Sequence, residues 1–164
     1  MDNTTLFTIG YEGLSFERFL ALLTEHGVEA LVDVRELPLS RKAGFSKKVL
    51  ARQLADAGID YVHIAKLGCP KVVRNAYRED NDWAEYTKGF MEHLNEQHEA
   101  LVELATLARK RTSALMCFEA DYQQCHRNMV ANAVAADTCM GVTHLRANSV
   151  RTESPAVKAL AAAA

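Results

Sequence analysis

The chain alternates short apolar runs with longer segments in which apolar residues recur every three or four positions. A continuous apolar run is typical of a strand that is covered on both faces of a sheet. Five such strands are expected, at residues 5–9, 30–34, 59–64, 113–118 and 141–145. Because helical segments alternate with them, the pattern predicts βαβ units, a mainly parallel sheet and helices on both of its faces.

The helical segments have identifiable ends. Phe16, Phe19, Leu20 and Leu23 have helical spacing and follow Ser15, a good N-cap residue. The first helix is therefore expected to bury one face against the sheet.

Three further helical segments are expected. One spans 46–58, a longer one runs from about 82 to 111, and the last follows the fourth strand. The long segment is expected to break near Gly89 or near Gln97. With 164 residues, the chain has the length of one domain. We expect a single α/β domain over residues 1–150 and a frayed or disordered tail over 151–164.

Composition excludes several classes of protein. A net charge of −2 with 24% charged residues argues against disorder and against a strongly basic nucleic-acid binder. No apolar run approaches the length of a membrane span, and the first residues lack the pattern of a signal peptide. We therefore expect a cytoplasmic protein whose thiols are mostly reduced. The absence of a CxxC pair weakens a structural zinc or thioredoxin-like interpretation.

Polar residues gather where the predicted strands end. The tetrapeptide GYEG (10–13) follows the first strand, Asp33 and Arg35 end the second, and Cys117 and Glu119 end the fourth. The carboxyl ends of parallel strands share one edge, and ligands bind in the crevice there. These distant residues are therefore expected to form one site.

The stretch CFEADYQQCHR (117–127) carries the densest chemistry. Asp121 and Gln124 resemble a capping box, which would place Cys125 in the first helical turn. The positive end of the helix dipole lowers the pKa of a thiol there. Cys125 is therefore expected to be accessible and is a candidate nucleophile. Alternatives are a redox pair with Cys117, a Cys/His metal site with His126, or two cysteines in the core.

The other two motifs also have two interpretations each. The residues Gly10, Tyr11, Glu12 and Gly13 could direct backbone N–H groups toward a phosphate at a helix N-terminus, or form a tight turn that needs glycine. They match neither the dinucleotide nor the P-loop pattern. The basic loop after Arg35 is expected to be exposed, and its lysines 42, 47 and 48 to be solvated.

Three stretches resemble, in order, the bacterial and archaeal family catalogued as domain of unknown function 488. They are TIGYEG, LVDVRELPLSRKAGFSK and CFEADYQQCHR, and the resemblance covers roughly residues 5 to 146. It implies a compact α/β domain with a Rossmann-like parallel sheet, hence a three-layer sandwich, and it implies no particular reaction. The matching positions are Gly10, Tyr11, Glu12, Gly13, Asp33, Arg35, Cys117, Glu119, Cys125, His126 and Arg127.

The leading hypothesis is an enzyme acting on an anionic, phosphate-bearing substrate, with nucleotides or nucleic acid as the first class to consider. In it Cys125 is the nucleophile, His126 assists proton transfer, Glu119 orients a partner, and Arg35 and Arg127 hold the anion. The residues expected to bind the substrate also include Gly10, Tyr11, Glu12, Gly13 and Asp33. The rival is a non-catalytic nucleotide- or nucleic-acid-binding module with structural cysteines. No metal is assigned, and neither a cofactor nor an oligomeric state is indicated.

Overall fold

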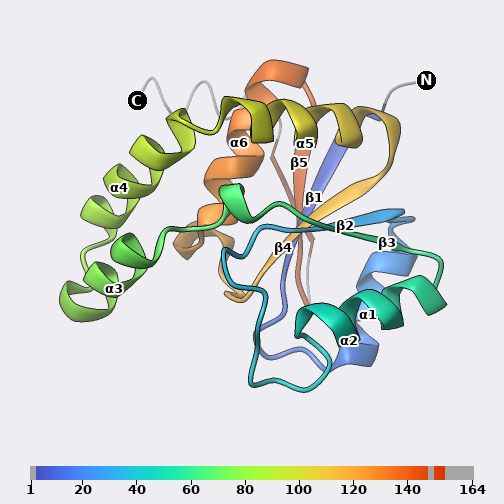
Figure 1. The fold of residues 1–164 in the computed structure, drawn as a ribbon. Coiled ribbons are helices and arrows are strands. Elements are labelled where there is room, and N and C mark those ends of the chain that lie inside the picture. Colours follow the sequence, from blue (N-terminus) through green and yellow to red (C-terminus); the bar gives the residue numbers. More distant parts are fainter. Residues whose placement is uncertain (1–2, 148–149, 154–164) are drawn as a thin grey trace.

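The computed structural model describes residues 3–147 and 150–153 (Figure 1). The strands of this part are β1 (Thr5–Gly10), β2 (Ala30–Asp33), β3 (Asp60–His63), β4 (Ser113–Cys117), β5 (Gly141–Leu145) and β6 (Val150–Glu153). The helices are α1 (Phe16–Glu25), α2 (Lys47–Asp56), α3 (Lys71–Asp80), α4 (Trp83–Asn95), α5 (His98–Lys110) and α6 (His126–Thr138). Two short 3₁₀ helices, η1 (Ala65–Leu67) and η2 (Tyr122–Gln124), lie in the connections.

The strands form one sheet in the order β3-β2-β4-β1-β5-β6. The first five in this order are parallel, and β6 pairs with β5 in the antiparallel direction. The five predicted strands and the parallel sheet are thus confirmed. The expectation of an unstructured tail is wrong for Val150–Glu153, where the short polar sequence VRTE gave no strand pattern. Residues 154–164 lie outside the described part.

Helices cover both faces of the sheet, which makes a three-layer α/β fold (Figure 1). From β1 to β3 the chain moves toward one edge, and from β3 to β5 it moves back toward the other. Right-handed crossovers therefore place α1 and α2 on one face, and α5 and α6 on the other. Phe19 and Leu50 belong to the first of the two resulting cores, and Leu104 and Val130 to the second.

The long helical segment predicted over 82–111 is two helices, which separate at Glu96 and Gln97. Gly89 stays inside α4, where a Cβ would come within 3.2 Å of the Val73 side chain on α3. Helix α3 was not predicted, although Val72, Val73, Ala76 and Tyr77 have helical spacing. Most of its residues are polar, and none is completely buried. Among the described helices, none combines the length and the apolar character needed to span a membrane.

The ends of the central strands lie in register at one edge of the sheet. Gly10 of β1 is opposite Cys117 of β4, and Asp33 of β2 is opposite both His63 of β3 and Met116 of β4. The expected convergence of these ends on a single carboxyl edge is confirmed. Successive side chains of a strand point to opposite faces, so Met116 packs with α1 and α2, while Cys117 packs with α4 and α6.

Candidate functional site

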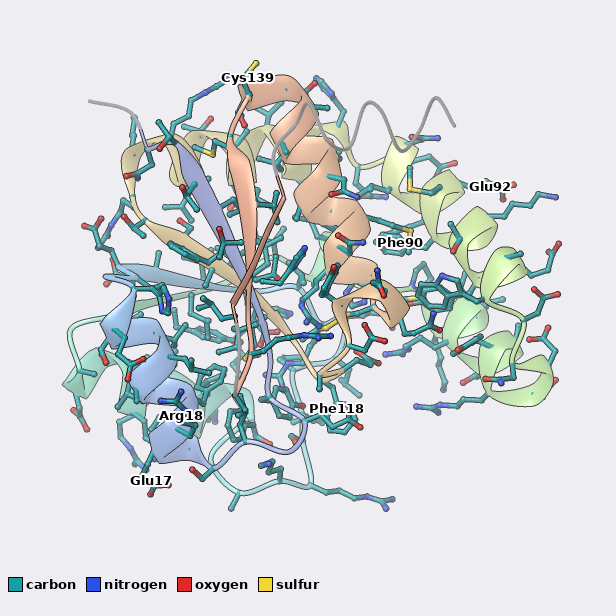
Figure 2. The ribbon with its side chains drawn as sticks, turned by 180° about the vertical axis from the view of Figure 1, so that it is seen from behind. Glu17, Arg18, Phe90, Glu92, Phe118 and Cys139 are labelled. Carbon is teal, nitrogen blue, oxygen red and sulfur yellow. A yellow bond between two sulfur atoms is a disulfide. The ribbon has the colours of Figure 1, made fainter. Side chains whose placement is uncertain are left out.

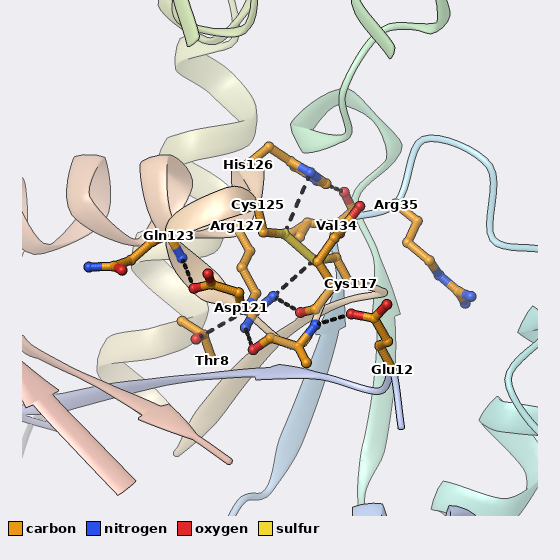
Figure 3. Close-up of a disulfide and its surroundings, with 12 residues drawn as sticks. Thr8, Glu12, Val34, Arg35, Cys117, Asp121, Gln123, Cys125, His126 and Arg127 are labelled. Atoms are coloured by element: carbon orange, nitrogen blue, oxygen red, sulfur yellow. Dashed lines mark hydrogen bonds between the residues drawn. A yellow bond between two sulfur atoms is a disulfide. The ribbon is translucent and has the colours of Figure 1, made fainter. Parts of the chain in front are cut away.

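A crevice of about 590 Å³ opens over this edge. Its walls come from the loop after β2, from the α3–α4 hairpin, and from the loop between β4 and α6. Figure 2 labels Phe118 of the last loop, and Figure 3 shows Cys117, Cys125 and Arg127 at either end of that loop. The charged lining residues are Arg35, Glu36, Arg41, Lys42, Arg74, Arg78 and Glu119. Aromatic lining residues are Tyr11, Tyr77, Trp83, Tyr86 and Phe118, and Cys69, Cys117 and His126 also contribute.

The two cysteines of CFEADYQQCHR form a disulfide (Figure 3). Cys117, the last residue of β4, and Cys125 are both buried in the core, each 1% exposed, and of the two only Cys117 lines the crevice. The expected exposure of Cys125 is wrong. Asp121 caps η2, accepting from the Gln123 N–H at 3.0 Å, and α6 begins one residue after Cys125. Cys125 is therefore the N-cap residue of α6, and Cys117 is the cysteine of the pair that borders the crevice.

His126 is buried with a defined orientation. Its Nε2 lies 2.6 Å from the carbonyl oxygen of Val34 (Figure 3). A carbonyl only accepts, so Nε2 carries the hydrogen and Nδ1 presents its lone pair to Cys125 Sγ at 4.0 Å. Burial lowers the pKa of His126 to about 4, although the bond to Val34 opposes that shift. The imidazole is therefore neutral at pH 7.

Arg127 is fully buried and does not line the crevice. Its guanidinium donates to Thr8 Oγ1 at 3.3 Å, to Cys117 Sγ at 3.3 Å, and to the carbonyls of Glu119 and Ala120 at 2.5 and 3.4 Å. Burial lowers the pKa of Arg127 to about 10, so it remains charged at neutral pH. Arg127 was predicted to hold an anion in the crevice, but it does not reach the crevice. It places a positive charge at the Cys117 sulfur and supports the loop between β4 and α6.

Glu119 approaches the same sulfur from the crevice side. Its Oε2 lies 3.3 Å from Cys117 Sγ. Burial raises the pKa of Glu119, although the charge of Arg127 opposes that shift. Cys117 thus lies between a buried cation and a carboxyl group whose proton is held more tightly than usual.

The GYEG turn supports the loop between β4 and α6. The backbone N–H groups of Tyr11 and Glu12 bond to carbonyls of Cys117 and Phe118, so they do not point to a ligand. Tyr11 N–H donates to the Cys117 carbonyl at 3.2 Å, and Glu12 N–H donates to the Phe118 carbonyl at 2.8 Å. A Cβ on Gly10 would overlap the backbone carbonyl of Glu119. Glu12 also accepts from the Ala120 N–H at 3.0 Å, and Gly13 has φ +77°. Of the four residues, only Tyr11 lines the crevice.

Asp33 and Arg35 form a buried, bidentate ion pair. Arg35 Nε and Nη2 donate to the two carboxylate oxygens of Asp33 at 2.8 and 2.7 Å, and Tyr61 donates to the same carboxylate at 2.5 Å. Burial alone would lower the pKa of Arg35, but the bonds and charge of Asp33 raise it. Arg35 Nη1 donates to the Tyr11 hydroxyl at 3.2 Å. Arg35 reaches the crevice, but Asp33 balances its charge.

Sequence reasoning missed the wall that α3 and α4 provide. Arg74 and Arg78 are four residues apart on α3, so they share a helix face with Tyr77. Trp83 stacks on Tyr86 with ring centroids 4.6 Å apart. The i, i+4 arginines were the available signal, but without a predicted α3 they had no element to lie on.

The prediction for the basic loop after β2 was partly wrong. Lys42 was expected to be a solvated lysine, but it lines the crevice, where Nζ donates to the Tyr11 carbonyl at 3.4 Å. Arg41 lines the crevice beside it and is exposed.

The donor set also has the composition of a metal site. One ligand atom each from Cys117, Cys125 and His126 lies within 4.8 Å of the others, and all three residues are buried. Two sulfurs and an imidazole nitrogen suit zinc and other soft or borderline ions better than magnesium or calcium.

Comparison with known proteins identifies the family. Searches of curated proteins and of solved structures found no match. A family model described as "Domain of unknown function DUF488" matches residues 15–134. This match covers more than half of the chain and includes every candidate site residue except those of the GYEG turn. The chain therefore belongs to the DUF488 family.

Proposed function

We propose that the protein is a cysteine-dependent enzyme that acts on an anionic, phosphate-bearing substrate in the crevice. The observation that carries the proposal is the position of Cys117. Its sulfur lies at the crevice wall, 3.3 Å from a buried guanidinium nitrogen and 3.3 Å from the Glu119 carboxyl oxygen. A fixed cation beside a sulfur favours the thiolate, which is the nucleophilic form.

The charge of the lining supports an anionic substrate. Five cationic side chains line the crevice against two carboxylates. Arg35 and Arg74 are paired with Asp33 and Glu36, at 2.7 and 3.0 Å. Arg41, Lys42 and Arg78 therefore provide the excess positive charge at the mouth, where a phosphate group is favoured.

The bonded state of the two cysteines supports a redox form of this chemistry. In the reduced protein, the Cys117 thiolate attacks an oxidised atom of the substrate. The bond from Cys117 Sγ to this atom forms, and the bond from the atom to its leaving group breaks, with the leaving group taking that electron pair. Cys125 Sγ then attacks Cys117 Sγ, the S–S bond forms, and the bond to the substrate breaks. The substrate leaves with the electron pair, and an external dithiol returns two electrons and two protons to the disulfide. The lone pair of His126 Nδ1 faces Cys125 Sγ and is positioned to take its proton.

The aromatic wall supports a nucleotide as the substrate class. Tyr77 and Trp83 line the crevice with rings 5.6 Å apart, on the same side as Arg74 and Arg78. Aromatic rings next to cations bind a base and a phosphate together. Binding at the carboxyl edge is also how Rossmann-like domains hold nucleotides. A dithiol cycle of this kind fits a cytoplasmic location.

The test is a protection experiment on the reduced protein. Iodoacetamide labelling, mapped by mass spectrometry, should modify Cys117 before Cys125 and Cys69, and inorganic phosphate should slow the labelling of Cys117. Cys139, exposed at the opposite end of α6, is the internal control, and phosphate should leave its rate unchanged (Figure 2). If Cys117 stays unlabelled until the protein unfolds, the enzyme proposal is wrong and a binding module with structural cysteines replaces it.

A further inference from the structure

We infer that in the reduced protein Cys117, Cys125 and His126 bind a zinc ion, with the fourth coordination position open to the crevice. The three donor atoms already lie within 4.8 Å of one another. A tetrahedral zinc ion has bonds of about 2.3 Å to sulfur and about 2.0 Å to nitrogen, so its ligands lie roughly 3.5 Å apart. Small side-chain rotations close that difference. The inference goes beyond the proposed function, because it requires two thiolates and a lone pair but no catalysis.

The orientation of His126 is the strongest support. A histidine that binds a metal usually donates its other ring N–H to a carbonyl or carboxylate, which fixes the ring and its tautomer. Nε2 of His126 makes such a bond to the Val34 carbonyl at 2.6 Å. The lone pair of Nδ1 is consequently held toward the sulfurs. Phe90 packs against the ring, with centroids 5.2 Å apart, and restricts its rotation further.

The ligands come from two elements that the fold fixes independently. Cys117 ends β4, while Cys125 and His126 begin α6. The Cα atoms of the two cysteines are 7.7 Å apart, so their side chains approach each other from opposite sides. Arg127 donates to the Cys117 sulfur and to the loop carbonyl of Glu119, which holds that loop in place. A site built in this way is formed before the ion arrives.

The open side of the site faces the crevice. Cys117, His126 and Glu119 line the crevice, whereas Cys125 does not. Glu119 Oε2 is 3.3 Å from Cys117 Sγ, so this carboxyl group borders the open position. Zinc sites with three protein ligands leave the fourth for water or substrate, whereas closed structural sites use four. An ion here would therefore be within reach of an anionic ligand.

The two states of the cysteines make binding depend on redox conditions. In the disulfide the sulfurs are bonded to each other, and the pair does not provide two thiolates. An external dithiol breaks the S–S bond, supplying two electrons and two protons. Binding of Zn²⁺ then displaces the proton of each thiol that still carries one, so protons are released as the ion binds.

Co²⁺ titration followed by absorbance tests this inference. Reduced protein should bind one Co²⁺ and show thiolate-to-cobalt charge transfer with the strong visible bands of a tetrahedral site, and Zn²⁺ should abolish them. The disulfide form should show none. Cys117→Ser and Cys125→Ser should lose the charge-transfer band or weaken it at least tenfold, whereas the matched control Cys139→Ser, at an exposed cysteine outside the crevice, should keep it.

The His126→Gln variant tests the third ligand, with circular dichroism to confirm folding. We expect its apparent affinity for Co²⁺ to fall at least tenfold. If the variant does not fold, native mass spectrometry of the wild-type protein decides the question, with one zinc per chain expected in the reduced form and none in the disulfide form. No charge-transfer band in the reduced wild-type protein would overturn the inference. Phosphate protection of Cys117 without added metal would still support the proposed function, so the two failures are distinguishable.

Discussion

At the scale of single residues, two buried positions of one motif differ in whether they line the crevice. Of the two cysteines of CFEADYQQCHR, each 1% exposed, only Cys117 lines it. The sequence identified both as candidates, but it favoured Cys125 as the accessible one. Cys125 is the N-cap of α6 and not a residue of its first turn, because η2 ends at Gln124 and α6 begins at His126. A shift of one residue rotates a side chain by about 100° around a helix.

Gly10 stabilises the fold because it has no side chain and lets the Glu119 backbone come close. In Gly10→Ala the new Cβ would overlap the Glu119 carbonyl, and the β4–α6 loop would have to move. We expect the free energy of unfolding to fall by about 3 kcal/mol, measured by urea denaturation. Gly27→Ala is the control, because its Cβ meets nothing and only φ +66° is strained, for about 1 kcal/mol. Equal losses in the two variants would show that the close approach at Gly10 does not matter.

Asp33 anchors the second strand end. In Asp33→Asn the buried Arg35 loses its bidentate partner and Tyr61 loses a charged acceptor. Thermal and urea unfolding should show a loss of about 3–5 kcal/mol, as is typical when one member of a buried pair is removed. The exposed pair Asp60–Arg111 provides the matched change, and Asp60→Asn should cost less than about 1 kcal/mol. A small effect of Asp33→Asn would mean that Arg35 has another way to satisfy its charge.

At the scale of elements, prediction succeeded where burial imposes a pattern. The strands and the helices α1 and α2 bury apolar residues at regular spacing, and their sequences show it. Helix α3 carries Val73, Ala76 and Tyr77 at helical spacing, but most of its residues are polar and none is completely buried, so this short stripe was overlooked. Its crevice residues Arg74, Tyr77 and Arg78 were missed for this reason. The position of the site at the carboxyl edge was predicted correctly, because this edge follows from the parallel sheet alone.

Trp83 makes the missed wall measurable, because it is the only tryptophan of the chain. A nucleoside monophosphate should change its fluorescence by stacking in the crevice, whereas ribose phosphate and inorganic phosphate should have little effect. Arg78→Gln should weaken the nucleotide titration about tenfold relative to Lys110→Gln, an exposed change on α5 away from the crevice. If nucleotides leave the fluorescence unchanged while phosphate protects Cys117, the substrate is anionic but has no base.

At the scale of the whole molecule, topology explains why residues more than a hundred positions apart act together. The chain leaves β1 toward one edge and returns to place β4 beside it, so Gly10 and Cys117 become neighbours. The same arrangement brings Arg35 and the basic loop to one opening. The alternation of strands and helices in the sequence predicted this convergence of strand ends. It did not predict which cations are free to bind a ligand, because that depends on the ion pairs that the side chains form.

The central claim is that Cys117 is a reactive sulfur in a crevice that attracts anions. The most direct measurement compares labelling of the reduced protein by iodoacetate, which is negatively charged, and by iodoacetamide, which is neutral. We predict that the iodoacetate-to-iodoacetamide rate ratio at Cys117 exceeds that at Cys139 several-fold at low salt. High salt should remove this excess, because it screens the exposed charges, and so should the double variant Arg41→Gln, Arg78→Gln. Equal ratios at the two cysteines, insensitive to salt and to the arginines, would contradict the claim.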